Sequence, residues 1–215
     1  AILLYGRSAD NLRDHRHVTS LLHRIRTVEN GVLVTPTMSF DERGHRPNEM
    51  TYFVCGYDQT GEAPEDFYPT VQDFIGEGGN FERPKAVVKN LAGVPAGSAY
   101  AGCEAVGGLH FKERTLAPGE TAGYTIMIGA VRKTEHAGET ILSMTAAYRK
   151  AAQTKAAYER MKTYWEQKVN VSYHTKDRRF DRYMQWVSFQ PILRRIYGCS
   201  FLPHHDYGKG GRGWR

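Results

Sequence analysis

The first clear secondary-structure pattern along the chain consists of β-branched and aromatic residues. These residues show no 3.6-residue apolar period. Residues 31–40 and 50–57 follow this pattern and predict two strands. The polar segment 41–48 between them predicts a turn or a protruding loop. Asp41 and Glu42 stand together there, but neighbouring residues at a strand end point in opposite directions, so we interpret them as a surface pair and not as catalytic carboxylates.

The same strand pattern returns at 100–106, 109–116 and 121–131. The last two segments are joined by Ala117-Pro-Gly-Glu120, where Pro and Gly stand in positions that suit a turn. Before them, residues 64–75 predict a short helix or turn that ends at Gly76. Residues 1–133 therefore predict part of an antiparallel β-sandwich, to which further strands would have to be added.

The pattern changes at Gly138, after which Ala, Lys, Glu, Gln and Met become frequent and no Gly or Pro occurs before Pro191. Apolar residues at helix-like intervals predict one long helix over 138–169, or two helices with a break near Gln153-Thr154. A second helix is expected to begin at a cap on Thr175 or Asp177 and to bend or end at Pro191. Its inward residues should be Phe180, Met184 and Val187. Such apolar stripes are typical of packing surfaces and carry no chemistry.

Composition indicates a water-soluble chain rather than a membrane or disulfide-rich one. The 215 residues are 40% hydrophobic and 12% aromatic, and no run approaches the roughly 20 apolar residues of a membrane span. The three cysteines, Cys55, Cys103 and Cys199, are widely spaced and form no CxxC pair. Free thiols in a reducing cytoplasm are the simplest interpretation.

The net charge of +6 is concentrated in residues 176–195 and in the last residues of the chain. A basic region raises the hypothesis of nucleic-acid binding, but no recognised DNA- or RNA-binding module is present. Inorganic phosphate or a sugar phosphate would also suit such a charge. His15, His17 and His23 raise the hypothesis of a metal site, which the lack of a nearby carboxylate cluster beyond Asp10 and Asp14 disfavours.

The last twenty residues, 196–215, combine glycines with cationic, imidazole and aromatic side chains. Glycine at this density allows a backbone to approach a ligand closely. Arg and Lys supply donors to phosphate or sugar oxygens, and Trp214 offers a flat face to a sugar ring. A flexible basic tail is the alternative, but the large apolar residues favour an ordered, ligand-facing loop.

The run Tyr-Gly-Cys-Ser-Phe-Leu-Pro-His-His-Asp-Tyr-Gly-Lys-Gly-Gly-Arg-Gly-Trp-Arg (197–215) resembles a segment of the inverting glycoside phosphorylases of the cellobiose phosphorylase family. It is most similar to the long members that act on β-1,2-linked glucans, the 1,2-β-oligoglucan phosphorylases. Phe74-Ile-Gly76 and Leu116-Ala-Pro-Gly-Glu120 also match family segments. The resemblance implies a mixed β and α, multidomain protein. Its expected parts are a β-sandwich portion at 1–133, a helical linker at 134–174, and the start of an (α/α)6 catalytic barrel at 175–215.

The resemblance also implies a chemistry. Glycoside cleavage needs a carboxylic acid to protonate the leaving oxygen, and an inverting phosphorylase uses phosphate as its nucleophile. The family's general acid is an Asp on a later barrel segment, so no residue of this chain is expected to be catalytic. The residues expected to bind the donor sugar are Arg212, Trp214 and Arg215, with Lys209, His204 and His205 as weaker candidates. Gly210 stands where shorter family members carry an Arg.

These expectations imply inorganic phosphate as co-substrate, no metal and no other cofactor. The expected partners are a β-glucan oligosaccharide and the remainder of the same polypeptide, with a homodimer left open and no nucleic acid or membrane. Two alternatives remain. One is the phosphorylase-like domain of a cyclic β-1,2-glucan synthase, and the other is a non-catalytic carbohydrate-binding β-sandwich. For Arg215 and Trp214, pairing with a buried carboxylate and wall packing are the alternatives to sugar binding.

Overall fold

The computed structural model describes residues 20–41, 44–169, 171–193, 195–196 and 199–200. They fall into two compact units, 1–154 and 155–215. The first unit consists of antiparallel sheets with helices, as expected for a β-sandwich domain. The division of the chain at 133 and 174 stays a prediction.

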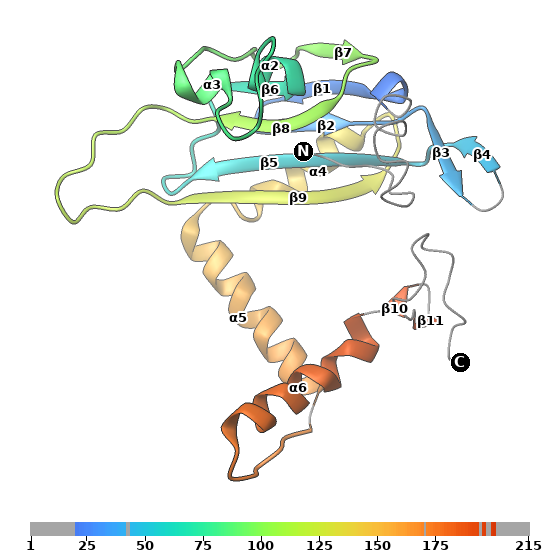
Figure 1. Ribbon diagram of the computed structural model, residues 1–215, viewed down its shortest axis with the longest axis vertical. Coiled ribbons are helices and arrows are strands. Elements are labelled where there is room, and N and C mark those ends of the chain that lie inside the picture. Colours follow the sequence, from blue (N-terminus) through green and yellow to red (C-terminus); the bar gives the residue numbers. More distant parts are fainter. Residues whose placement is uncertain (1–19, 42–43, 170, 194, 197–198, 201–215) are drawn as a thin grey trace. The chain divides into compact units, whose positions relative to one another are not determined.

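Five strands of the first unit form one antiparallel sheet in the order β7–β1–β2–β5–β9 (Figure 1). Their bounds are Ala99–Ala101 (β7), Arg24–Val28 (β1), Gly31–Val34 (β2), Met50–Asp58 (β5) and Tyr124–Arg132 (β9). Val32 lies opposite Val54, and Val54 lies opposite Ile128, so these three side chains share one face of the sheet. Strand β1 was not predicted, although its alternation of exposed arginines with buried Ile25 and Thr27 is regular.

A second antiparallel ladder covers this face. It is formed by β6 (Asp66–Thr70) and β8 (Ala105–His110). The core between the layers consists of buried apolar side chains from both of them: Ile25, Val32, Val34, Phe67 and Ala105. The layers approach closely at Gly107, where a Cβ would lie 2.4 Å from Val54 Cγ2, so the narrow spacing here requires glycine.

Helix α4 (Ala137–Ala146) covers the opposite face of the five-stranded sheet. Its Ile141 is fully buried among Leu33, Phe53 and Cys55. A polar network at one end of this core joins three elements, because Asn30 Nδ2 donates to Tyr57 Oη and to Thr145 Oγ1, both at 2.8 Å. The unit therefore has two apolar cores, one on each face of its main sheet.

Shorter elements complete the first unit. Within the segment 41–48, predicted as a turn or protruding loop, Gly44–Pro47 instead forms strand β4, which pairs with β3 (Met38–Asp41). Helix α2 (Val71–Ile75) begins at Thr70, whose Oγ1 accepts from Asp73 N at 3.1 Å, and ends at Gly76 with φ +74°. Helix α3 (Lys85–Val88) follows.

The predicted strand 109–116 is mostly wrong, because residues beyond His110 leave the ladder. Arg114 reaches back to pair with the Asp58 carboxylate, and Gly123 N donates to Gln59 Oε1 at 2.9 Å. Side chains, rather than strand pairing, hold this connection between β8 and β9. The expected turn is present, with Gly119 at φ +85° and Glu120 N donating to Ala117 O at 2.9 Å.

The helical region contains α5 (Ala151–Lys168) and α6 (Arg178–Leu193), followed by the two-residue strands β10 (Arg195–Ile196) and β11 (Cys199–Ser200). The helix break lies at 147–150, slightly before the predicted one. Asp177 is the cap, since its Oδ1 accepts from Arg179 N at 2.8 Å. Helix α6 does not end at Pro191, since it runs to Leu193, and a bend there stays a prediction. The inward placement of Phe180 and Val187 is wrong, because both are exposed.

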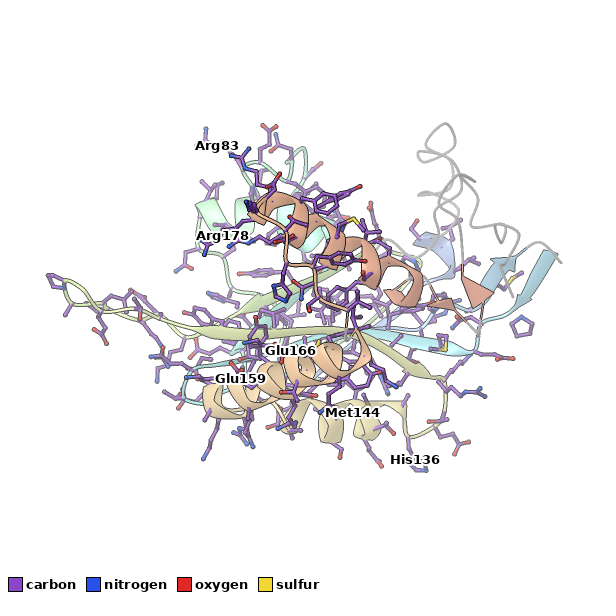
Figure 2. The ribbon with its side chains drawn as sticks, turned by 90° about the horizontal axis from the view of Figure 1, so that it is seen from below. Arg83, His136, Met144, Glu159, Glu166 and Arg178 are labelled. Carbon is purple, nitrogen blue, oxygen red and sulfur yellow. The ribbon has the colours of Figure 1, made fainter. Side chains whose placement is uncertain are left out.

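Within this region, the Trp165 and Phe189 rings meet edge to face, with centroids 5.5 Å apart. Most other large apolar side chains of α5 and α6 are exposed: Tyr158, Met161, Tyr164, Phe180, Tyr183 and Trp186. The same two helices carry charged residues, among them Glu159 and Glu166 of α5 and Arg178 of α6 (Figure 2). No described helix is long and apolar enough to cross a membrane.

Candidate functional site: a recess at the end of strand β8

The sugar-binding residues predicted from the sequence lie outside the described residues. They are His204, His205, Lys209, Arg212, Trp214 and Arg215. His15 and His17 also lie outside them. Their assignment stays a prediction.

His23 does belong to the described part and is a packing residue there. Its side chain is buried, and its Nδ1–H donates to the Cys103 carbonyl at 3.1 Å. Burial lowers the pKa of His23, which keeps the imidazole neutral near pH 7. In the described ranges no three His, Cys, Asp or Glu side chains are grouped so that they could hold a metal ion.

Cys55 and Cys103 are free thiols. Cys55 is fully buried, and burial raises its pKa to about 12, so it cannot act as a nucleophile at neutral pH. Cys103 is half-buried.

A recess of about 370 Å³ lies where β8 ends and β9 begins. We call it the β8 recess. Its lining combines carboxylates, cations, an imidazole and two aromatic rings, among them Glu65, His110, Phe111, Glu113, Arg114 and Tyr124. The volume is within the usual range for small-molecule sites.

His110 is oriented by a carboxylate from the neighbouring strand. Its Nδ1 lies 2.7 Å from Asp66 Oδ1, across the β6–β8 ladder in which the two residues are direct partners. Because a carboxylate only accepts, Nδ1 carries the hydrogen, and in the neutral imidazole Nε2 is then an acceptor. Such a nitrogen can receive a hydroxyl hydrogen of a ligand.

The apolar part of the recess comes from Phe111 and Tyr124. Their ring centroids are 4.7 Å apart, and Tyr124 is about half exposed at 47%. An exposed ring supported by a second ring offers a flat, rigid face with a polar edge. A sugar ring presents the complementary surface, with C–H groups on its faces and hydroxyls on its rim.

Arg114 fixes one wall of the recess. It pairs with Asp58, which is 4% exposed and also accepts from Thr60 N at 2.8 Å and Glu62 N at 2.9 Å. Burial alone would raise the pKa of Asp58, but the hydrogen bonds from Thr60 and Glu62 and the charge of Arg114 together lower it. A lowered pKa is the opposite of what a general acid needs, so Asp58 is a structural anion.

The β8 recess is a candidate binding site. It provides hydrogen-bond acceptors and donors around an aromatic face, which suits a neutral molecule rich in hydroxyl groups.

The family model of the glycosyl hydrolase 94 supersandwich domain matches residues 8–151. The chain belongs to the glycosyl hydrolase 94 family. The match covers the whole sheet, the β6–β8 layer and helix α4. No curated protein matches the chain.

Membership in this family supports a role in carbohydrate chemistry. The residues of the β8 recess were not predicted from the sequence as candidates for that role. His110, Phe111 and Tyr124 were interpreted only as parts of strands. The signal was weak, because Asp66, His110 and Tyr124 come from three separate segments that only the ladder β6–β8 and the β8–β9 connection bring together.

Proposed function

We propose that this chain is the supersandwich part, with following helices, of an inverting glycoside phosphorylase that cleaves a β-glucan. The observation that carries the proposal is the glycine-rich run 197–215, placed after a domain of the glycosyl hydrolase 94 supersandwich family. The resemblance of this run to the enzymes of β-1,2-glucans favours that linkage.

In the proposed reaction, a phosphate oxygen attacks the anomeric carbon from the α face while the β-glycosidic bond breaks. A carboxylic acid gives its proton to the leaving oxygen, so the products are α-glucose 1-phosphate and a glucan shortened by one unit. The acid is an Asp outside this chain. Phosphate is already a nucleophile, so the reaction needs no carboxylate base to activate it. Because phosphate is an anion, cationic donors are needed to hold it.

The chain contributes binding and framing in this scheme. Arg212 and Arg215 hydrogen-bond the donor sugar and Trp214 stacks on it, with Lys209, His204 and His205 as further contacts. The exposed aromatic side chains of α5 and α6 support packing against the remainder of the polypeptide, as an (α/α)6 barrel would provide.

The test is phosphate-dependent release of glucose 1-phosphate by the polypeptide in which, on this proposal, the chain is embedded. Release from β-1,2-glucan, but not from β-1,3- or β-1,4-glucan, is expected, and only when phosphate is present. Trp214→Ala should lower kcat/KM at least tenfold, whereas Arg179→Gln, which removes an exposed cation of α6, should leave it unchanged. Equal sugar release without phosphate would make the protein a hydrolase and refute the proposal.

A second candidate function is non-catalytic carbohydrate binding, because the β8 recess offers a sugar-sized site on the sandwich itself. Under this alternative, Tyr124→Ala would abolish glucan binding by the 215-residue chain, and no glucan would be cleaved with or without phosphate. If the chain is instead the phosphorylase-like domain of a cyclic β-1,2-glucan synthase, it would trim or size the glucan that the synthase makes, and mass spectrometry of the synthase products would show the change in glucan length.

A further inference from the structure

A larger cavity, of about 490 Å³, lies on the face of the five-stranded sheet that α4 covers. We call it the α4 cavity. Strands β1, β5 and β7 contribute to its lining, together with the residue that follows β2 and the segment that joins β9 to α4. The polar and cationic groups are Arg24, Arg26, Thr35, Thr51, Thr134 and Lys133.

Strand alternation gathers these groups. Arg26 lies opposite Leu33, and Thr51 lies opposite Val131, and both of these apolar partners face the α4 core. Arg24 is two residues from Arg26 along β1 and therefore lies on the same face. Lys133 follows β9 directly, and its backbone N–H donates to Glu49 O at 2.7 Å, which fixes the start of the connection to α4.

The α4 cavity carries an excess of positive charge. Three cations line it, and Glu135 is the one carboxylate among its described lining residues. Within the described part of the chain, no carboxylate lies at ion-pair distance from Arg26 or Lys133. The Arg24 guanidinium donates to the Leu21 and His23 carbonyls, at 3.2 and 2.9 Å, which orders it without neutralising it.

The amino-terminal end of α4 adds to this positive field. Ala137, its first residue, lines the cavity, and the N-cap residue His136 makes no side-chain capping bond. His136 instead projects outward at the start of the helix (Figure 2) and lies 3.3 Å from Glu139. Arg26 packs against the first turn, since a Cβ on Gly138 would lie 2.7 Å from its Nη2. A guanidinium beside a helix amino terminus is an arrangement that an anion stabilises, and Glu139 is the acidic residue already present in the first turn of α4.

Hydroxyl groups complete the site. Thr35 Oγ1 and Thr51 Oγ1 lie 2.9 Å apart, with Thr51 only 2% exposed, so one hydroxyl donates to the other and the second hydrogen is free for an acceptor. Ala99 and Ala101 of β7 lie opposite Arg26 and Arg24 and supply an apolar wall. Cations, hydroxyl donors and helix N–H groups converging on one cavity form a recognised pattern for phosphate.

We propose that the α4 cavity binds the phosphate group of a small phosphorylated sugar. The phosphate is held between Arg26, Lys133 and the first turn of α4, and the sugar occupies the rest of the volume along Ala99 and Ala101 of β7. The phosphate part stands on the geometry above. The sugar part rests on the proposed function, in which a sugar phosphate is the product.

The site can be tested on the 215-residue chain itself, by calorimetric titration at 50 and 150 mM salt. The probes are inorganic phosphate, α-glucose 1-phosphate, sulfate and glucose. Saturable binding of glucose 1-phosphate is expected, tighter than that of inorganic phosphate and weakening as salt rises. Glucose should show none.

Arg26→Gln and Lys133→Gln should each weaken glucose 1-phosphate binding at least tenfold. Arg132→Gln is the matched control, because it removes the neighbouring cation of β9, which does not line the cavity. Circular dichroism of each variant shows whether it folds. An equal loss in Arg132→Gln, no saturation at 10 mM of either phosphate probe, or equally tight binding of glucose would overturn the proposal.

Two results assign the parts separately. If inorganic phosphate binds as tightly as glucose 1-phosphate, the sugar part of the proposal is refuted and only an anion site remains. Because no turnover is measured, a failed glucan-cleavage assay leaves the phosphate site standing, and loss of the site leaves the proposed reaction standing.

Discussion

Replacing Asn30 by alanine tests whether the buried polar network organises the first unit. Asn30 is 1% exposed and donates two hydrogen bonds, to Tyr57 of β5 and to Thr145 of α4. Each contributes about 1 kcal/mol net. Thr145 keeps its own bond to the Ile141 carbonyl at 2.8 Å, so the variant does not leave that hydroxyl without a partner. Together these values predict a loss of about 2 kcal/mol in the free energy of opening the sheet.

The assay has to report on the sheet and not on the helices. All three tryptophans, Trp165, Trp186 and Trp214, lie in the second unit, so intrinsic tryptophan fluorescence does not follow the first. Hydrogen–deuterium exchange of peptides covering β2 and β5 does follow it. A loss of about 2 kcal/mol should accelerate exchange of the protected amides about 30-fold.

Two further variants separate the hydrogen bonds from the volume of the side chain. Thr145→Val removes one of the two partners, and the double variant with Asn30→Ala should lose less than the sum of the two single losses. Asn80→Ala, at an exposed position, should change exchange of β2 and β5 by less than twofold. The reasoning is refuted if Asn30→Ala changes exchange less than threefold, or if the two single losses add fully.

Three other predictions follow from burial. Ile141→Ala should cost about 2–5 kcal/mol of stability by opening a cavity in the α4 core, whereas Met144→Ala on the exposed side of α4 should cost under about 0.5 kcal/mol. Urea unfolding followed by hydrogen exchange measures both losses. Equal losses would show that α4 does not pack on the sheet through Ile141. Burial lowers the pKa of His23 below the ordinary histidine value of 6.5. Below pH 6.5, His23 therefore binds a proton in the unfolded chain but stays neutral in the folded chain until the pH reaches its folded pKa. Stability should therefore fall as pH drops from 6.5 toward the folded pKa, and His23→Gln should flatten this decline; an unchanged slope would exclude His23 as its cause. Cys55 should not react with a thiol reagent at pH 8 until the first unit unfolds, whereas half-buried Cys103 should react. Peptide mass spectrometry measures the labelling of each cysteine. Fast labelling of both would contradict the burial of Cys55.

The sequence predicted the layers of the first unit better than it predicted their edges. Long segments such as β5 and β9 have a regular β pattern and pair over nine residues, so propensity and tertiary structure agree there. The predicted strand at 109–116 extended too far because side-chain anchoring by Arg114 is a tertiary interaction. The hairpin β3–β4 was missed for the converse reason, since Gly44 and Pro47 indicate a turn and weaken the strand pattern.

The helices show the same limit. Asp177 was predicted as a cap because capping is local, and it is confirmed. The apolar stripes of α5 and α6 were interpreted as core, yet Met161 is 58% exposed and Phe180 is 45% exposed. A stripe specifies a surface that packs, but the sequence of one helix does not say what packs against it.

The lining of the α4 cavity follows from the alternation of side chains along a strand, which directs neighbouring residues to opposite faces of the sheet. In β1, the alternation that buries Ile25 between the layers directs Arg24 and Arg26 to the opposite face, so building the core places two cations beside α4. Lys133 joins them from more than a hundred residues away, because β9 ends where α4 begins. A charge count along the sequence points to residues 176–195, where cations are consecutive. The α4 cavity brings together cations that are far apart in the sequence, because the sheet fixes them on one face around one volume.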